Sequence, residues 1–180
     1  SSISNIDKLE QPPYKISFNN KKLFKVLSHF DVSKRTISLG KPSRQSSTSK
    51  WSWSSDVNVE ASGGNDGLIN GVCGFHTSLE VNPWWEVDLE GVFSIDSIYI
   101  YNRLDIKERF RKFSIHVSLD GHVYNVLFDK TDNELFGGFD GNPFVLNTEC
   151  DVKARYIKII ATGETYLHLD QIDVFGKLIK

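Results

Sequence analysis

This 180-residue sequence has only two cysteines, no large excess of positive or negative charge and no long apolar run. Each of these shortages excludes a class of protein. Its two cysteines, Cys73 and Cys150, are too few for a disulfide scaffold. Neither has a cysteine or histidine neighbour at the spacing of a zinc site, so we expect two free thiols or one bridge. No apolar stretch approaches the roughly 20 residues that a membrane-spanning helix needs.

The charges are nearly balanced, with 21 Lys and Arg against 23 Asp and Glu, for a formal net charge of −2. A chain without an excess of either sign produces little long-range field. We therefore expect no nucleic acid as partner, and the sequence does not favour membrane binding.

Catalytic motifs are missing as well: there is no nucleophile elbow, no phosphate-binding glycine loop and no paired-histidine metal motif. Glu86 and Asp88 share one face of a predicted strand. Side chains at this spacing lie roughly 7 Å apart on an open face, where nothing raises the pKa of one of them selectively. We expect a domain that is not an enzyme, which leaves open its attachment to an enzyme in a longer chain.

The composition that remains is globular, with 39% hydrophobic and 24% charged residues. Apolar residues recur with a period of two from about residue 80 onward, as in half-buried strands. The segments concerned contain Trp85, Val87 and Leu89, then Ile98 and Ile100, then Phe113 to Leu119, Tyr124 to Phe128, Arg155 to Ala161 and Leu169 to Gly176. Turn signals such as Asp120-Gly121 and Asn142-Pro143 separate them. This pattern predicts an all-β sandwich or barrel.

The first part of the chain has a different character. Residues 1–36 are polar at the start, contain Pro12-Pro13 and read as an N-terminal tail or linker, with one short helix or strand at residues 21–27. A single domain is predicted for residues 37–177, which is ample length for one hydrophobic core. Within it, the Ser- and Trp-rich stretch from Ser43 to Ser55 is predicted to be an ordered loop.

Several short motifs in this domain follow one another in a characteristic order. They are Gly74-Phe75-His76-Thr77, Asn82-Pro83-Trp84-Trp85-Glu86-Val87-Asp88-Leu89, Asn102-Arg103-Leu104-Asp105, Ser118-Leu119-Asp120-Gly121 and Leu167-His168-Leu169-Asp170-Gln171-Ile172-Asp173-Val174-Phe175-Gly176. In this order they resemble the coagulation-factor 5/8 type C, or discoidin-like, domains of the galactose-binding-like superfamily. Within it the chain is similar to fucolectins and to modules appended to bacterial glycosyltransferases. The resemblance implies a jelly-roll β-sandwich of about eight antiparallel strands with ligand loops at one end.

The same resemblance implies a set of ligand-binding residues. In fucolectins a histidine of the His-Thr step and two arginines hold the sugar, and by motif position these fall on His76, Arg103 and Arg109. Fucolectins carry adjacent cysteines between the Asp and the second Arg, but here this segment reads Ile106-Lys107-Glu108 and is one residue shorter. The departure leaves the sugar open between fucose, galactose and others, and Arg111 competes with Arg109 for the second role.

The residues themselves suit this chemistry. Arginine offers a planar fork of five donors to adjacent sugar oxygens, and Asp105 can fix that fork or accept from a hydroxyl. A neutral His76 can hydrogen-bond through one ring nitrogen and be oriented through the other. Aromatic faces pack against the C–H side of a sugar, and Trp51 and Trp53 are the candidates.

Each of these residues also has a structural interpretation. Arg103 and Asp105 could form only a loop-stabilising ion pair, and His76 could only bond a backbone carbonyl. Trp51 and Trp53 could anchor a loop, and the cations of residues 107–112 could form a solvated charged edge. His168 is interpreted as structural, although a jelly roll could bring it to the same end as His76.

A structural calcium ion is the one cofactor that the resemblance implies. Its ligands would come from Asn65 and Asp66, in a turn ending at Gly67, and from Asp170 and Gln171 before the last strand. An ordinary turn is the alternative for residues 65–67.

Two functional hypotheses follow. The first is a non-catalytic lectin-like module that recognises a small sugar epitope such as fucose or galactose. The second is a discoidin-type module that docks to protein, or to another domain of its parent chain such as a glycosyltransferase, or that binds lipid.

Overall fold

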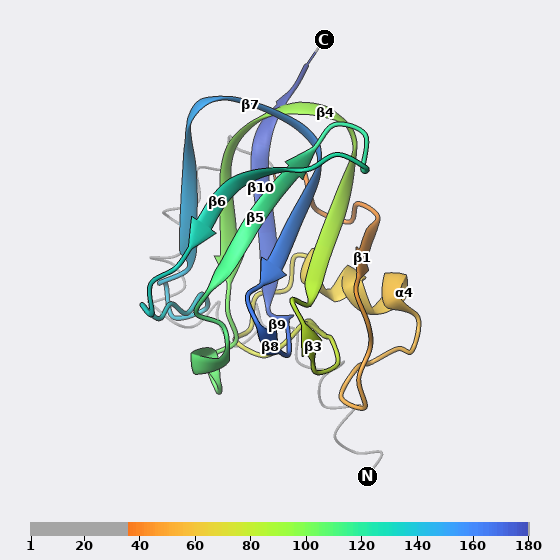
Figure 1. Ribbon diagram of the computed structural model, residues 1–180, viewed down its shortest axis with the longest axis vertical. Helices are drawn as coiled ribbons and strands as arrows, with labels where there is room; N and C mark the ends of the chain where they lie inside the picture. Colours follow the sequence, from red (N-terminus) through yellow and green to blue (C-terminus); the bar gives the residue numbers. More distant parts are fainter. Residues whose placement is uncertain (1–35, 180) are drawn as a thin grey trace, which may run out of the picture. The chain divides into compact units, whose positions relative to one another are not determined.

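The computed structural model describes residues 36–179, and antiparallel strands dominate this part of the chain (Figure 1). The predicted tail, including the short element at residues 21–27, lies outside the described residues except for Thr36. No helix in the described part is long and apolar enough to span a bilayer.

Ten strands and three short helical segments are present in residues 36–179. The strands are β1 (Ser43–Gln45), β2 (Phe75–His76), β3 (Glu80–Val81), β4 (Trp84–Tyr101), β5 (Phe113–Ser118), β6 (Asn125–Lys130), β7 (Phe144–Ala161), β8 (Glu164–Thr165), β9 (His168–Leu169) and β10 (Gln171–Leu178). The helical segments are α4 (Val57–Ala61) and the 3-10 turns η1 (Ser62–Gly64) and η2 (Lys107–Arg109).

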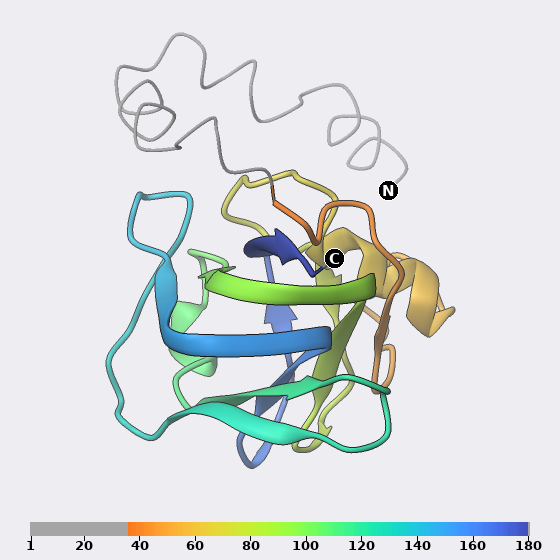
Figure 2. The same cartoon turned by 90° about the horizontal axis from the view of Figure 1, so that it is seen from above.

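The strands β4 and β7 build both layers of the sandwich because each is 18 residues long and bends over one end of it (Figures 1 and 2). Residues 84–88 of β4 pair with 156–160 of β7 in a layer of order β1-β4-β7-β5-β6. Residues 93–100 of β4 pair with 144–154 of β7, and β10 pairs with the same half of β4. The result is a jelly roll of eight strand segments, and it confirms the predicted fold class.

The predicted inward residues form the core between these layers. Trp85, Val87, Ile157, Ile172 and Val174 are all fully buried. Trp85 stacks on Phe75 and donates its indole N–H to the Ala61 carbonyl at 2.9 Å, which fixes α4 against the sandwich. Burying side chains of this size contributes about 1.5–3 kcal/mol each, so the core accounts for most of the driving force.

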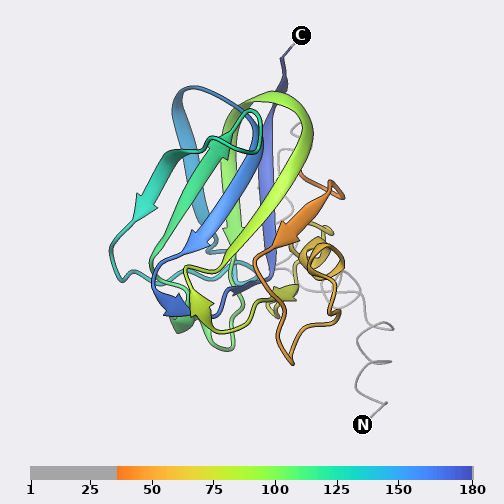
Figure 3. The same ribbon diagram turned by 45° about the vertical axis from the view of Figure 1, so that its right-hand side comes forward.

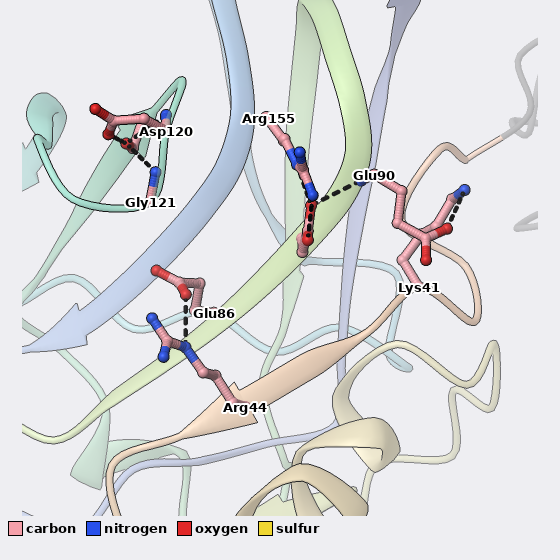
Figure 4. A network of polar contacts seen from close by, with 9 residues as sticks. Lys41, Arg44, Glu86, Glu90, Asp120, Gly121 and Arg155 are labelled. Atoms are coloured by element: carbon pink, nitrogen blue, oxygen red, sulfur yellow. Dashed lines mark hydrogen bonds and ion pairs between the residues drawn. The ribbon is translucent and has the colours of Figure 1, made fainter.

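Two predictions from the alternating pattern are wrong at particular residues. Leu119 is exposed because β5 ends at Ser118, whose hydroxyl accepts from the Gly121 N–H in a tight turn. Glu86, predicted to lie on an open face, is 2% exposed because Arg44, Tyr124 and Lys158 cover it. Figure 4 shows the Arg44 contact. Cys73 and Cys150 are not joined in a disulfide.

The short strands and turns gather at one end of the sandwich. β3, β8 and β9 lie together with η2 and the loop after β1 at the end opposite the C-terminus (Figures 1 and 3). β2 pairs with β9 and β3 with β8, in two small antiparallel pairs. This end therefore contains every segment that carries a predicted ligand-binding residue.

Candidate ligand-binding site

The centre of the site is a pair of histidines on β2 and β9. His76 and His168 are direct cross-strand partners, and their ring centroids lie 4.9 Å apart. The preceding pair, Phe75 and Leu169, is fully buried in the core. Because side chains alternate along a strand, both histidines project from the opposite side of the pair. Both are nevertheless buried, so other segments cover them.

His76 is held in one orientation by its neighbours. Its backbone N–H donates to Glu60 Oε1 at 3.0 Å, and its ring Nδ1 lies 2.7 Å from the Thr77 carbonyl oxygen. A carbonyl can only accept, so Nδ1 carries the proton and Nε2 carries the lone pair. Nε2 has no hydrogen bond within residues 36–179. The ring is therefore oriented through one nitrogen and offers the other as an acceptor.

His76 stays neutral at physiological pH. Burial lowers its pKa, and the positive charges of Arg103 and Arg109 lower that pKa further, against the Thr77 hydrogen bond. The pKa of His168 falls to about 3, chiefly through burial and then through Arg103. Two arginines that are distant in sequence thus lie within electrostatic reach of both imidazoles.

Arg103 is aligned by a carboxylate. Its Nε and Nη2 donate to the two oxygens of Asp105 at 2.6 and 2.5 Å, a bidentate pair that raises the pKa of Arg103 and lowers that of Asp105. The Arg103 side chain is only 14% exposed, whereas Asp105 is 55% exposed. Two of the five guanidinium donors are used, so the others remain available to a ligand.

An aromatic wall, consisting of Trp51 and Tyr166, stands beside the histidines. The two rings meet edge to face at 5.6 Å, and they lie 5.4 and 5.3 Å from the His76 ring. The Arg109 guanidinium lies 5.4 Å from the centre of the Tyr166 ring, a cation–π geometry that positions this second arginine. One exposed side of an aromatic wall is suited to the apolar face of a small ring-shaped ligand.

The structure thus brings together His76, Arg103, Asp105 and Arg109 from the predicted set. Arg111 instead donates from Nε to the Glu108 carbonyl at 3.0 Å and so secures η2, which favours Arg109 as the second arginine. Trp53 is as exposed as Trp51, but the ring contacts with His76 come from Trp51. Sequence reasoning missed Tyr166, although its position two residues before His168 places the two on one side of an extended segment.

The four predicted calcium ligands serve mainly as hydrogen-bonding residues. The Asn65 amide donates to the Ser38 and Lys41 carbonyls, and one Asp170 oxygen accepts from the Asn70 and Gly71 N–H groups. Gln171 accepts from the Gly67 N–H, and Asp66 accepts from the Leu68 N–H. Together these bonds tie residues 65–71 to the segment before β1 and to the start of β10.

Within residues 36–179 no group of three His, Cys, Asp or Glu side chains could hold a metal ion. Asp170 is buried and close to Asp66 and Asp173, and its pKa is raised to about 7, chiefly by burial. The pKa of Asp173 is likewise raised by burial, to about 6. Calcium prefers six to eight oxygen ligands, many of them anionic. Only two of the predicted ligands, Asp66 and Asp170, are carboxylates. Asn65 Oδ1 is buried without a hydrogen-bond partner in residues 36–179 and is a third oxygen at this place, but the set as arranged still falls short of six ligands.

Comparison with known proteins agrees with this fold. Residues 43–169 match the model of the F5/8 type C domain. The chain belongs to this family. The match covers every strand from β1 to β9 and all the segments that meet at the histidine pair.

Individual relatives of this F5/8 type C domain are carbohydrate-binding proteins by name. Fucolectin from Anguilla anguilla is 28% identical over 124 residues, which is 66% of this chain and 77% of that protein. A fucose binding module from Streptococcus pneumoniae is 26% identical, with a TM-score of 0.62 and coverage of 82% of this chain and 99% of that one. The lectin domain of Lectinolysin, solved with Lewis B antigen, is 25% identical with a TM-score of 0.62, covering 79% and 97%.

Proposed function

We propose that this F5/8 type C domain is a non-catalytic carbohydrate-binding module whose ligand lies against His76, Arg103, Arg109 and the aromatic wall. The observation that carries the proposal is the meeting of a neutral, oriented imidazole with two arginines at one end of the sandwich. The names of the relatives support the ligand class.

Each group in the site has a distinct part in binding. The Nε2 lone pair of His76 accepts from a sugar hydroxyl. The free N–H groups of Arg103 donate to neighbouring oxygens, and the Asp105 pair keeps that fork in one plane. Arg109 donates from its position over Tyr166, and Trp51 packs against sugar C–H groups. Because His76 accepts and the arginines donate, the site discriminates between a hydroxyl and a ring oxygen or ether.

The epitope is a small sugar such as fucose or galactose at the end of a glycan. A fucose binding module among the structural relatives and the match to fucolectin support the first choice. A Clostridium perfringens module solved with GalNAc-β-1,3-galactose shares the fold, at 18% identity and a TM-score of 0.56. The segment before Arg109 lacks the paired cysteines of fucolectins, so the wall of Trp51 and Tyr166 takes over the apolar contact.

A glycan array probed with the 180-residue chain tests this proposal. Arg103→Ala should abolish the hits, because losing charge-assisted hydrogen bonds costs about 1.5–3 kcal/mol, or about 10- to 100-fold in affinity. Arg155→Ala is a matched control, since Arg155 makes the same bidentate pair with Asp88 on the outer face of the sheet. Arg109→Ala should weaken binding far more than Arg111→Ala.

A blank array from folded protein would contradict the proposal and favour docking to another domain of a parent chain. Loss of binding in Arg155→Ala as well as Arg103→Ala would show that stability, and not the site, had been tested. Thermal unfolding of each variant distinguishes these outcomes.

A further inference from the structure

The cations of this domain divide into two groups by their ion pairs. Seven of those in residues 36–179 pair with a carboxylate, as Lys41 does with Glu90 and Arg44 with Glu86 (Figure 4). The other members of this group are Arg103, Lys130, Lys153, Arg155 and Lys158. Within the same residues, the cations without such a pair are Lys50, Lys107, Arg109, Arg111, Lys112 and Lys177.

Five of these six unpaired cations lie in the segments that form the candidate site. Lys50 Nζ lies 4.5 Å from the centre of the Trp51 ring, and the Arg109 guanidinium lies 5.4 Å from that of Tyr166. Both members of the aromatic wall therefore carry an unpaired cation. Lys107 belongs to η2, and Arg111 and Lys112 follow directly after it.

Two of the carboxylates nearby are engaged by other cations. Asp105 is engaged by Arg103, and Asp132 is engaged by Lys130. The Lys130 ammonium also donates to the carbonyls of Arg111 and Glu134, so it adds a buried positive charge behind the segment. Between residues 103 and 112 five cations face two carboxylates, whereas the whole chain has a net charge of −2.

Such a local excess of positive charge costs free energy in the unbound domain and is relieved by an anion. A neutral sugar needs the donors of Arg103 and Arg109 but has no use for Lys50 at the other side of the wall. A carboxylate or sulfate would pair with these cations in a partly enclosed site, where charge-assisted hydrogen bonds are strong. The group is thus better matched to an acidic ligand than to a neutral one.

We propose that the site takes an acidic glycan, whose carboxylate or sulfate group pairs with Lys50 on the Trp51 side of the aromatic wall, while Arg103 and Arg109 hold the sugar ring. The proposal rests on the carbohydrate-binding function above and specifies its ligand class. The sugar ring occupies the His76–Arg103 side, and the anionic substituent lies toward Lys50.

Matched glycans test this ligand class. Each neutral oligosaccharide is measured by calorimetry beside its sulfated form and beside a form that carries a carboxylate, at low and high salt. The acidic member should bind about 2- to 5-fold more tightly than its neutral parent, and rising salt should reduce this advantage because exposed charges are screened. Whichever acidic form gains affinity identifies the group.

Single substitutions locate the effect. Lys50→Gln should remove most of the advantage of the acidic glycan, and Lys50→Arg should restore it. Lys177→Gln is the control, because Lys177 is also unpaired but lies near the C-terminal end of β10, away from the site. It should leave both affinities unchanged.

Three outcomes overturn the inference. Equal affinity for neutral and acidic members would overturn it while leaving the carbohydrate-binding function intact. Absence of binding to every glycan would remove both. Salt-sensitive binding to any polyanion, unaffected by Arg103→Ala, would show a general charged surface in place of a glycan site.

Discussion

His76 and His168 face each other across β2 and β9 with ring centroids 4.9 Å apart, and their surroundings differ in one respect. His76 bonds the Thr77 carbonyl, whereas both ring nitrogens of His168 are buried without a hydrogen-bond partner in residues 36–179. A buried polar group without a partner costs free energy, and protonating it there costs more. His168 therefore makes the domain sensitive to acid.

The pH dependence of stability tests this role of His168. Its pKa is about 3 in the folded domain against an ordinary value of 6.5, so between these values the unfolded chain binds the additional proton. The free energy of unfolding should therefore fall as the pH falls from about 6.5 toward 3, by at most about 1.4 kcal/mol per pH unit. His168→Leu should lose this dependence in urea unfolding between pH 4.5 and 7.5. An unchanged slope would contradict the buried neutral imidazole.

Asp170 should have the opposite effect on the pH dependence of the unfolding free energy. Its folded pKa of about 7 lies above the ordinary value of 3.8, so the folded domain binds the additional proton between them. Stability should be lost as the pH rises from about 4 to about 7, by at most about 1.4 kcal/mol per unit. Relative to Asp170→Asn, the wild-type free energy of unfolding should fall over this range and level off above it.

The two residues should partly cancel in the wild-type domain, whose own profile between pH 4.5 and 7 should be flatter than that of either variant. Asp173→Asn is the control for Asp170→Asn. Because the folded pKa of Asp173 is about 6, the difference in unfolding free energy between wild type and Asp173→Asn should level off about one pH unit lower. A parallel pair of profiles for wild type and Asp170→Asn would show that Asp170 is ionised throughout.

Calcium provides a third test, at the hydrogen bonds of residues 65–71. Because one Asp170 oxygen already accepts from two backbone N–H groups, and no group of three acidic or imidazole side chains gathers in residues 36–179, we expect the same unfolding midpoint in millimolar calcium and in chelator. If calcium bound with a Kd 1,000-fold below its concentration, it would add about 4 kcal/mol to the free energy of unfolding and raise the thermal midpoint by several degrees. Such a rise would show that these side chains rearrange into the ligand set expected from the sequence.

The sandwich could be predicted from the sequence because the period of two at residues such as Trp85 and Ile157 indicates which face of each strand is buried. Spacing and motif order also pointed to His76 and Arg103, which are fixed to strands and their ends. Trp51 was one of two aromatic candidates, but its contact with Tyr166 could not be predicted, because it depends on how the loop after β1 folds back. Ser52 donates to the His76 carbonyl at 2.6 Å, and this contact between residues 24 positions apart helps fix the loop against β2.

The fold of the loop after β1 also sets the positions of Trp51 and Trp53. A matched pair of variants tests which of the two contacts the sugar. Trp51 and Trp53 have similar exposure, 53% and 55%, but Trp51 has the ring contacts with His76 and Tyr166. Trp51→Ala should weaken glycan binding by about 2- to 10-fold, since an aromatic contact contributes about 0.5–1.5 kcal/mol, whereas Trp53→Ala should change it less. Trp51→Phe should keep most of the affinity. A larger loss in Trp53→Ala, measured by calorimetry on folded protein, would move the sugar contact to the outer part of the loop and leave Trp51 as a support for His76.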